Sequence, residues 1–213
     1  EILTEMEFKD GEMIKMKTFH PNGKLRFDMS IKNKGENGVR KEYDMNGVLT
    51  LECNMKDGKM HGLSKSYYEN GVLQKECMWK NDKQQGTYKS YHENGQLKFS
   101  GNYKDHMQNG LFKGYSEDGI LIEESNWKDD KKDGSFKEYY DTGELLLESN
   151  SKDGKRVGTS IAYHKNGKKK IETSFKNGEI DGIMKMWDEN GQLTIEQHND
   201  GKKRLYSKAW NED

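Results

Sequence analysis

Residues 38–62 read GVRKEYDMNGVLTLECNMKDGKMHG, and this stretch decides the fold. From Val48 onward, apolar and polar side chains alternate over nine residues, which indicates a half-buried β-strand. A shorter alternating segment ends at Tyr43, and Asn46-Gly47 between the two segments is the strongest short signal for a β-hairpin. The stretch therefore predicts two strands joined by a tight turn, followed by a wetter, longer and looser turn that ends at Gly62.

The same pattern returns every 24 residues along almost the whole chain, and glycine marks it most clearly. The turn glycines are Gly23, Gly47, Gly71, Gly95, Gly119, Gly143, Gly167 and Gly191. A second series comprises Gly38, Gly62, Gly86, Gly110, Gly134, Gly158 and Gly182. The aromatic series comprises Phe19, Tyr43, Tyr67, Tyr91, Tyr115, Tyr139, Tyr163 and Trp187. Three columns in phase identify a repeat protein, whose function resides in a repeated surface rather than in one pocket.

The fold class predicted from these columns is all-β: an elongated, single-layer antiparallel β-meander of about eight 24-residue hairpin repeats. We expect one continuous array over residues 1–213, with regular repeats at 23–190 and atypical capping repeats at 1–22 and 191–213. A helix is the alternative for segments so rich in Lys and Glu. Two glycines in every repeat and an alternation of period two oppose it. The pattern departs from itself at Ser100, Ser151, Ile161, Lys169 and the two offset ends.

The length of the Asn-Gly turn decides which side chains share a face. A two-residue turn would pair Tyr43 with Thr50 and Lys41 with Glu52, placing the tyrosine and leucine columns on opposite faces. A three-residue loop with Gly47 in a left-handed bulge would instead pair Tyr43 with the leucine at position 49. We favour the three-residue loop, because it gives a largely polar chain one dry and one wet face.

Composition excludes several classes of protein. Only 31% of residues are apolar and 34% are charged, which argues against a large closed core. The 36 basic and 37 acidic residues are interspersed, so no basic stripe for nucleic acid exists. No apolar run approaches the ~20 residues that a membrane helix needs. The remaining solution is a thin fold in which each repeat buries a little against its neighbours.

The two cysteines, Cys53 and Cys77, are also 24 residues apart. If each repeat holds two strands, another strand separates them, and their Cα atoms lie ~9.5 Å apart. A disulfide needs Cα atoms within about 7 Å of one another. We therefore predict two free thiols.

No column carries the geometry of a catalytic or metal site. The aromatic column from Tyr43 to Trp187 is interpreted as a miniature core, each ring covering the leucine of its own hairpin, or as an exposed partner-binding face. The acidic and basic columns are interpreted as a cross-strand charge ladder. His20, His92 and His164 share one column three repeats apart, too far to ligate one metal. We predict no catalytic residue, no cofactor site and no metal site.

The repeat resembles the bacterial variant of the MORN repeat, over roughly residues 5–210. The copies that carry the resemblance best are Gly62 to Lys80 and Gly86 to Lys104. The resemblance implies an extended antiparallel meander and a non-enzymatic scaffold or interaction protein, with a protein partner bound through a sheet face or an open edge. A toxin-neutralising (antitoxin or immunity) role is the first alternative that it implies. Binding to a lipid surface is the second, and the near-zero net charge disfavours it.

The sequence also gives expectations for oligomeric state and location. We expect a monomer or a weak dimer formed through a sheet edge. The resemblance, the Lys-rich surface and a chain that starts at Glu1 rather than Met favour the cell envelope or secretion, with the cytoplasm as the alternative. The sequence does not separate a removed targeting segment from a trimmed chain.

Overall fold

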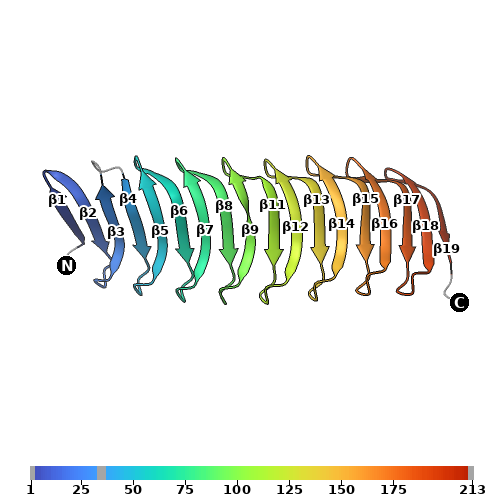
Figure 1. The fold of residues 1–213 in the computed structure, drawn as a ribbon, viewed down its shortest axis with the longest axis horizontal. Coiled ribbons are helices and arrows are strands. Elements are labelled where there is room, and N and C mark those ends of the chain that lie inside the picture. The colour runs from blue at the N-terminus through green and yellow to red at the C-terminus, as the bar shows by residue number, and fades with distance from the viewer. Residues whose placement is uncertain (1–2, 33–36, 211–213) are drawn as a thin grey trace. The chain divides into compact units, whose positions relative to one another are not determined.

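The structure is a computed structural model that describes residues 3–32 and 37–210. These residues form antiparallel β-strands and no helix (Figure 1). The chain divides into two compact units, residues 1–107 and 108–213, which are described separately. The strands of the first unit are β1 (Thr4–Lys9), β2 (Glu12–Phe19), β3 (Leu25–Lys32), β4 (Asn37–Tyr43), β5 (Leu49–Lys56), β6 (Lys59–Tyr67), β7 (Leu73–Lys80), β8 (Lys83–Tyr91) and β9 (Leu97–Lys104).

The second unit has the same organisation. Its strands are β11 (Gly110–Tyr115), β12 (Leu121–Lys128), β13 (Lys131–Tyr139), β14 (Leu145–Lys152), β15 (Lys155–Tyr163), β16 (Lys169–Lys176), β17 (Glu179–Trp187), β18 (Leu193–Asp200) and β19 (Lys203–Ala209). The two-residue strand β10 (Met107–Gln108) lies at the division between the units. Within each unit, successive strands pair antiparallel in chain order, so each unit is a single-layer meander as predicted.

The Asn-Gly turn is a three-residue loop, as predicted. The amide of Asp44 donates to the carbonyl of Val48 at 3.0 Å, and the amide of Gly47 donates back to Asp44 at 3.0 Å. Gly47 has φ +86°, a conformation that costs glycine little and other residues much more. Tyr43 then pairs with Leu49 across the hairpin.

A second irregularity, which the sequence did not predict, follows directly. Tyr43 pairs with Leu49, but Glu42 pairs with Leu51, so Thr50 is an extra residue on its strand. This bulge turns Leu51 and every second residue after it to the face opposite Tyr43. It also brings Lys41 opposite Glu52. Each of the two turn alternatives was therefore right about one pair.

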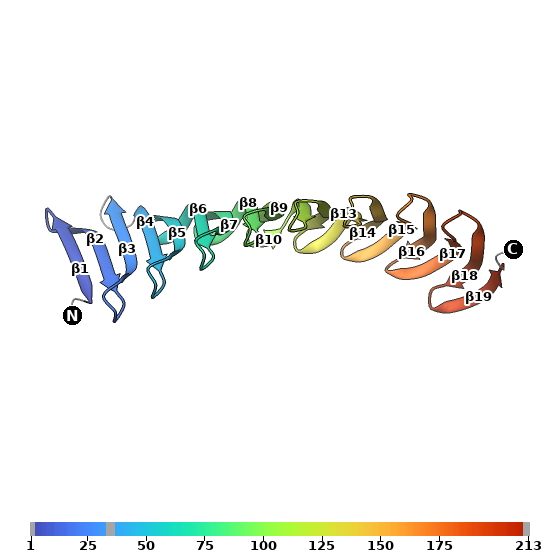
Figure 2. The same ribbon diagram turned by 90° about the horizontal axis from the view of Figure 1, so that it is seen from below.

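The bulge corrects the expectation of a single dry face. One face, here called the tyrosine face, carries Tyr43, Leu49, Lys41, Glu52 and their equivalents in the other repeats. The other, here called the cysteine face, carries Leu51, Cys53, Met55 and their equivalents. The leucines of one strand are thus divided between the two faces. Bulges also bend strands, and Figure 2 shows the hairpins of the second unit curved rather than flat.

The turn between repeats is tighter than expected, which is a second correction. Lys56 pairs with Lys59, leaving a two-residue turn in which Asp57 (φ 51°) and Gly58 (φ 71°) are both left-handed. Two positive φ values define the turn type that matches the twist of paired strands. The apparent looseness comes instead from a bulge in the following strand, between the pairs Cys53–Ser64 and Met55–Met60.

The second glycine series lies within this bulge from Gly62 onward, whereas Gly38 pairs with Ile31 in a regular ladder. Gly62, for example, has φ +88° and pairs with Trp79 of the next strand. The same relation joins Gly86 to Tyr103 and Gly110 to Trp127. A large ring therefore faces a residue without a side chain in these repeats. In one repeat of the second unit, Ser151 replaces the aromatic residue and pairs with Gly134.

Cysteine, serine and threonine side chains, with two phenylalanines, form the buried line of the cysteine face. Buried residues on this line are Cys53, Ser64, Cys77, Phe112, Ser125, Phe136, Ser149, Ser160 and Thr173. Cys53 and Cys77 are free and each pairs with Ser64, so a strand separates them as predicted. Burial raises the pKa of both thiols. The core of each unit is thus one side chain thick.

The end repeats differ in this bulge. Three residues are skipped between Met60 and Ser64, whereas one is skipped between Met13 and Lys15 at the first hairpin. One is likewise skipped between Arg204 and Tyr206 at the last. This accounts for the one-residue offsets at both ends of the sequence. The boundaries of the capping repeats at 22 and 191 stay predictions.

Candidate interaction face

The tyrosine face is a closed network of charges and hydroxyls. Lys113 lies 2.7 Å from Glu124 on the neighbouring strand, and Tyr139 of the next repeat donates to the same carboxylate at 2.9 Å. These two partners lower the pKa of Glu124, while burial and the carboxylate raise the pKa of Tyr139 to about 12. The same arrangement joins Tyr91 to Glu76. The charged and hydroxyl groups of these two sites therefore already have partners within the chain.

The predicted aromatic column therefore contributes to packing and hydrogen bonding within the sheet. Tyr43 and Tyr67 pair with the leucines of their own hairpins, as the miniature-core interpretation requires, and are half-buried. Tyr115, Tyr139 and Tyr163 occupy the same register, and Trp187 ends the column. Tyr163 pairs with Lys169 in place of leucine. Whether a partner uses this column stays a prediction.

The histidine column links successive repeats. Nε2 of His20 lies 2.9 Å from the carbonyl oxygen of Tyr43, and His164 makes the same contact with Trp187. Tyr68, at the equivalent position, donates its hydroxyl to the carbonyl of Tyr91 at 2.8 Å. Histidine and tyrosine are thus interchangeable here because both reach one carbonyl of the next hairpin. No group of three or more His, Cys, Asp or Glu arranged to hold a metal ion occurs within residues 3–32 and 37–210.

An apolar line crosses the cysteine face of the second unit. Leu147 pairs with Ala162, which also pairs with Ile171; Met186 and Ile195 continue the line over β17 and β18. All five side chains are half-buried. We call these five residues the apolar stripe. At equivalent positions of the first unit the side chains are mixed: Glu42, Leu51, Ser66, Lys75, Ser90 and Phe99. The repeat does not itself require an apolar line at this place.

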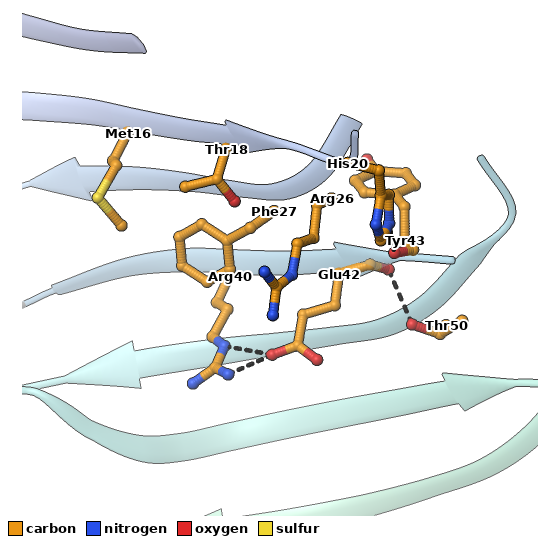
Figure 3. A pocket seen from close by; sticks show the side chains of 9 residues that line it. All are labelled: Met16, Thr18, His20, Arg26, Phe27, Arg40, Glu42, Tyr43 and Thr50. Atoms are coloured by element: carbon orange, nitrogen blue, oxygen red, sulfur yellow. Dashed lines mark hydrogen bonds and ion pairs between the residues drawn. The ribbon is translucent and has the colours of Figure 1, made fainter. Parts of the chain in front are cut away.

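A groove opens on the cysteine face of the first unit (Figure 3). It has a volume of about 560 Å³ and lies over β2 to β5. Its lining residues are Met16, Thr18, His20, Arg26, Phe27, Arg40, Glu42, Tyr43 and Thr50. The guanidinium of Arg40 lies 5.4 Å from the centre of the Phe27 ring and is paired with the Glu42 carboxylate. Figure 3 shows Arg26 beside this pair, with no interaction drawn to it.

The sequence departures fall on both faces. Ile161 replaces a lysine of the tyrosine face and lies between Glu148 and Glu172, while Ser100 pairs with Lys89 where other repeats have a carboxylate. Lys169 partly compensates, since its Nζ lies 2.5 Å from Glu172. Sequence reasoning missed the groove and the stripe, because both depend on the unpredicted bulge. The clustering of Arg26 and Arg40, two of only four arginines, was the available signal.

Comparison with known proteins gives the family. The sequence pattern of the MORN repeat variant matches residues 14–33, 60–81, 84–105, 108–129, 132–153, 156–177 and 180–198. Residues 34–59 are left unmatched, although the described residues of this segment form a hairpin with the regular register. No curated protein matches the chain. No helical segment in the described part of the chain has the length and apolarity to span a bilayer.

Two solved structures were compared as well. The crystal structure of TcdB2-TccC3 is similar at 12% identity with a TM-score of 0.24, and that of TcdB2-TccC3-Cdc42 at 13% identity with a TM-score of 0.21. Each match covers 98% of this chain but 15% of the other. The chain thus spans a small part of the length of the proteins it was compared with.

Proposed function

Because this chain belongs to the MORN repeat variant family, whose repeats are typical of scaffold and interaction proteins, we propose that it binds a protein partner through its cysteine face. The observation that supports this choice is the apolar stripe, which extends over five neighbouring strands of the second unit. An apolar line rimmed by polar residues is the usual character of a protein-binding surface.

The two faces differ in what they offer a partner. On the tyrosine face, Lys113, Glu124 and Tyr139 satisfy one another, so a partner would have to displace these contacts. On the cysteine face, the stripe residues Ile171 and Met186 are half-buried and have no polar group to desolvate. Binding there removes apolar surface from water at little cost. The open edges are the alternative surface, since β1 and β19 each pair with one described strand.

Two substitutions test the choice of face, and the repeat supplies the precedent for each. Ile171→Lys introduces a charge into the stripe at the position where an earlier repeat carries Lys75, so the fold accepts lysine there. Ile161→Lys is the matched control on the tyrosine face, where lysine is the regular residue, as at Lys137. Both variants add one positive charge to the same unit.

The assay is affinity capture from a lysate of the source cells, followed by quantitative mass spectrometry. We expect the wild type and Ile161→Lys to retain the same protein, and Ile171→Lys to lose at least nine-tenths of it, because burying an unpaired charge in an interface costs several kcal/mol. Loss with Ile161→Lys alone would move the binding surface to the tyrosine face. Equal retention by all three would exclude the stripe. Toxin neutralisation and lipid binding stay predictions from the family resemblance, tested by co-expression rescue and by flotation with anionic liposomes.

A further inference from the structure

The groove over β2 to β5 carries a charge arrangement that the repeat does not require. At the position of Arg40, other repeats have Ser64, Tyr88, Phe112, Phe136 and Ser160, side chains that lie on or beside the buried line of the cysteine face. At the position of Arg26, the next two repeats have Thr50 and Gln74, and later repeats have Lys98, Ile122, Leu146, Lys170 and Thr194. Neutral residues therefore satisfy the fold at both positions. Two guanidinium groups in one groove need another explanation.

The family pattern singles out the same region. It matches the hairpins before and after residues 34–59 and leaves this one unmatched. The hairpin nevertheless keeps the regular pairs, Tyr43 with Leu49 and Lys41 with Glu52. The junction with β3 differs in its backbone, because Gly38 pairs with Ile31 without the bulge of the other repeats and its φ is not positive. Arg40 and Glu42 lie beyond this junction, on the part of β4 that keeps the regular register, so their departure is one of side chains. Arg40 and Glu42, which line the groove, belong to this unmatched hairpin.

We propose that the groove binds a side-chain carboxylate in an acidic segment of the protein partner. This proposal rests on the proposed function, because it concerns one contact of that partner. Arg26 makes no hydrogen bond or ion pair with any described residue, and its guanidinium is exposed beside the Arg40–Glu42 pair. A planar guanidinium with five donors matches a carboxylate bidentately. Thr18 adds a hydroxyl at the wall of the groove, whereas the Thr50 hydroxyl donates to the backbone carbonyl of Glu42 at 3.1 Å.

The charge of the groove favours a carboxylate over a phosphate. Arg26 and Arg40 supply two positive charges and Glu42 one negative charge, which leaves an excess of one. One carboxylate neutralises this excess. A phosphate dianion would exceed it by one negative charge and would be repelled more strongly by Glu42 than a carboxylate would. The Phe27 ring beneath Arg40 gives an apolar floor for the methylene groups of an acidic side chain.

The test is a nuclear magnetic resonance titration of the full chain with hexaglutamate, observing the arginine Nε–Hε signals. The chain has four arginines, so the signals are few and can be assigned by substitution. We expect Arg26 and Arg40 to shift with one common saturation curve while Arg156 and Arg204 do not. Arg26→Gln should weaken binding at least about tenfold, since it removes a charge-assisted pair. Glutamine already occupies the equivalent position 74, so the variant should fold.

Arg156→Gln is the control, because Gln84 is its counterpart three repeats earlier. Parallel, non-saturating shifts of all four arginines would overturn the proposal, and so would equal affinity of Arg26→Gln and the wild type. Saturation by inorganic phosphate at a lower concentration than hexaglutamate would overturn the preference for carboxylate. If hexaglutamate fails to bind while the stripe still captures the partner, the groove proposal alone fails. If it binds and no partner is captured, the proposed function alone fails.

Discussion

Replacing Gly134 with alanine tests the glycine bulge that separates the repeats. Gly134 has φ +111°, and a Cβ atom built there would lie 3.1 Å from Cβ of Asn126. Gly110 is the matched control, because it occupies the same column with φ +87° and has nothing within 4 Å of an added Cβ. Both substitutions place alanine in a left-handed conformation, and only the first adds a close contact.

The magnitudes follow from these two differences. A left-handed conformation costs a residue with a Cβ roughly 1–2 kcal/mol, which is the whole expected effect of Gly110→Ala. Gly134→Ala adds a contact with an atom that is one bond from the backbone, and its φ lies farther from the left-handed minimum near +57°. We expect about 2–4 kcal/mol in total for Gly134→Ala. For a chain of this length, 1 kcal/mol lowers Tm by about 2–4 °C.

The assay is thermal and urea unfolding of both variants, followed by far-ultraviolet circular dichroism and tryptophan fluorescence. Trp127 pairs with Gly110 on one side and with Lys132, at the edge of the Gly134 bulge, on the other, so fluorescence reports on this part of the array. Gly134→Ala should be less stable than Gly110→Ala, and both less stable than the wild type. Equal stability of the two variants would refute the contact argument. Wild-type stability of both would refute the left-handed bulge itself.

Three further predictions concern single contacts. Asp130→Ala should lower the free energy of unfolding in urea by about 2 kcal/mol, because Asp130 is left-handed (φ 62°) and offsets this strain by accepting a hydrogen bond from the amide of Gln108 at 2.6 Å. Asp130→Gly should cost less than half of that, because glycine adopts the left-handed conformation without strain. Tyr139→Phe should weaken the pH dependence of stability between pH 10 and 12, measured by alkaline unfolding. The fold raises the pKa of Tyr139 from 10.0 to about 12. The contribution of Tyr139 to the free energy of unfolding is therefore complete below pH 10 and is lost as the pH rises to 12. If Tyr139→Phe leaves the pH dependence of unfolding unchanged, the contact of Tyr139 with Glu124 is contradicted. Cys77→Ser should stay within about 1 kcal/mol of the wild type in thermal unfolding. The serine hydroxyl would be a stronger acceptor for Trp79 Nε1 than the thiol, as Ser125 is for Trp127 at 2.8 Å two repeats later; a loss above about 2 kcal/mol would refute this.

The repeat and its strands could be predicted because they depend on local chemistry. Asn46-Gly47 fixed the hairpin, and the left-handed Gly47 fixed the three-residue loop. Two glycines in each repeat excluded helix. The spacing of Cys53 and Cys77 then predicted an intervening strand, which the structure confirms.

The assignment of side chains to faces could not be predicted in the same way. The extra residue at Thr50 has no turn signal, because it is an ordinary strand residue within an alternating segment. The bulge is required only when the Tyr43–Leu49 pair and the Lys41–Glu52 pair form together. From the sequence, each pair belongs to a different turn length, so the two pairs are alternatives. The faces on which the apolar stripe and the arginine groove form are set by this bulge, so neither feature could be predicted from the sequence.

The turn between repeats was misjudged for a related reason. Asp57-Gly58 is a two-residue turn, but the bulge at Gly62 moves the strand pattern by several residues and resembles a long loop in sequence. Some other repeats have no glycine in this turn. In one of them the two turn residues are Asn81 and Asp82, and both are left-handed. Asp82 is held there by its bond to the amide of Met60 at 2.7 Å. The contact is between repeats, so no single repeat reveals it.

The central claim, that a partner is bound on the cysteine face, is tested most directly by methyl nuclear magnetic resonance of the chain with its captured partner. The Ile171, Met186 and Ile195 methyl signals should shift or broaden on binding. Leu111 and Ile183, exposed by 43% and 44% on the tyrosine face, should stay unchanged. Perturbation of Leu111 and Ile183 with an unchanged stripe would contradict the account.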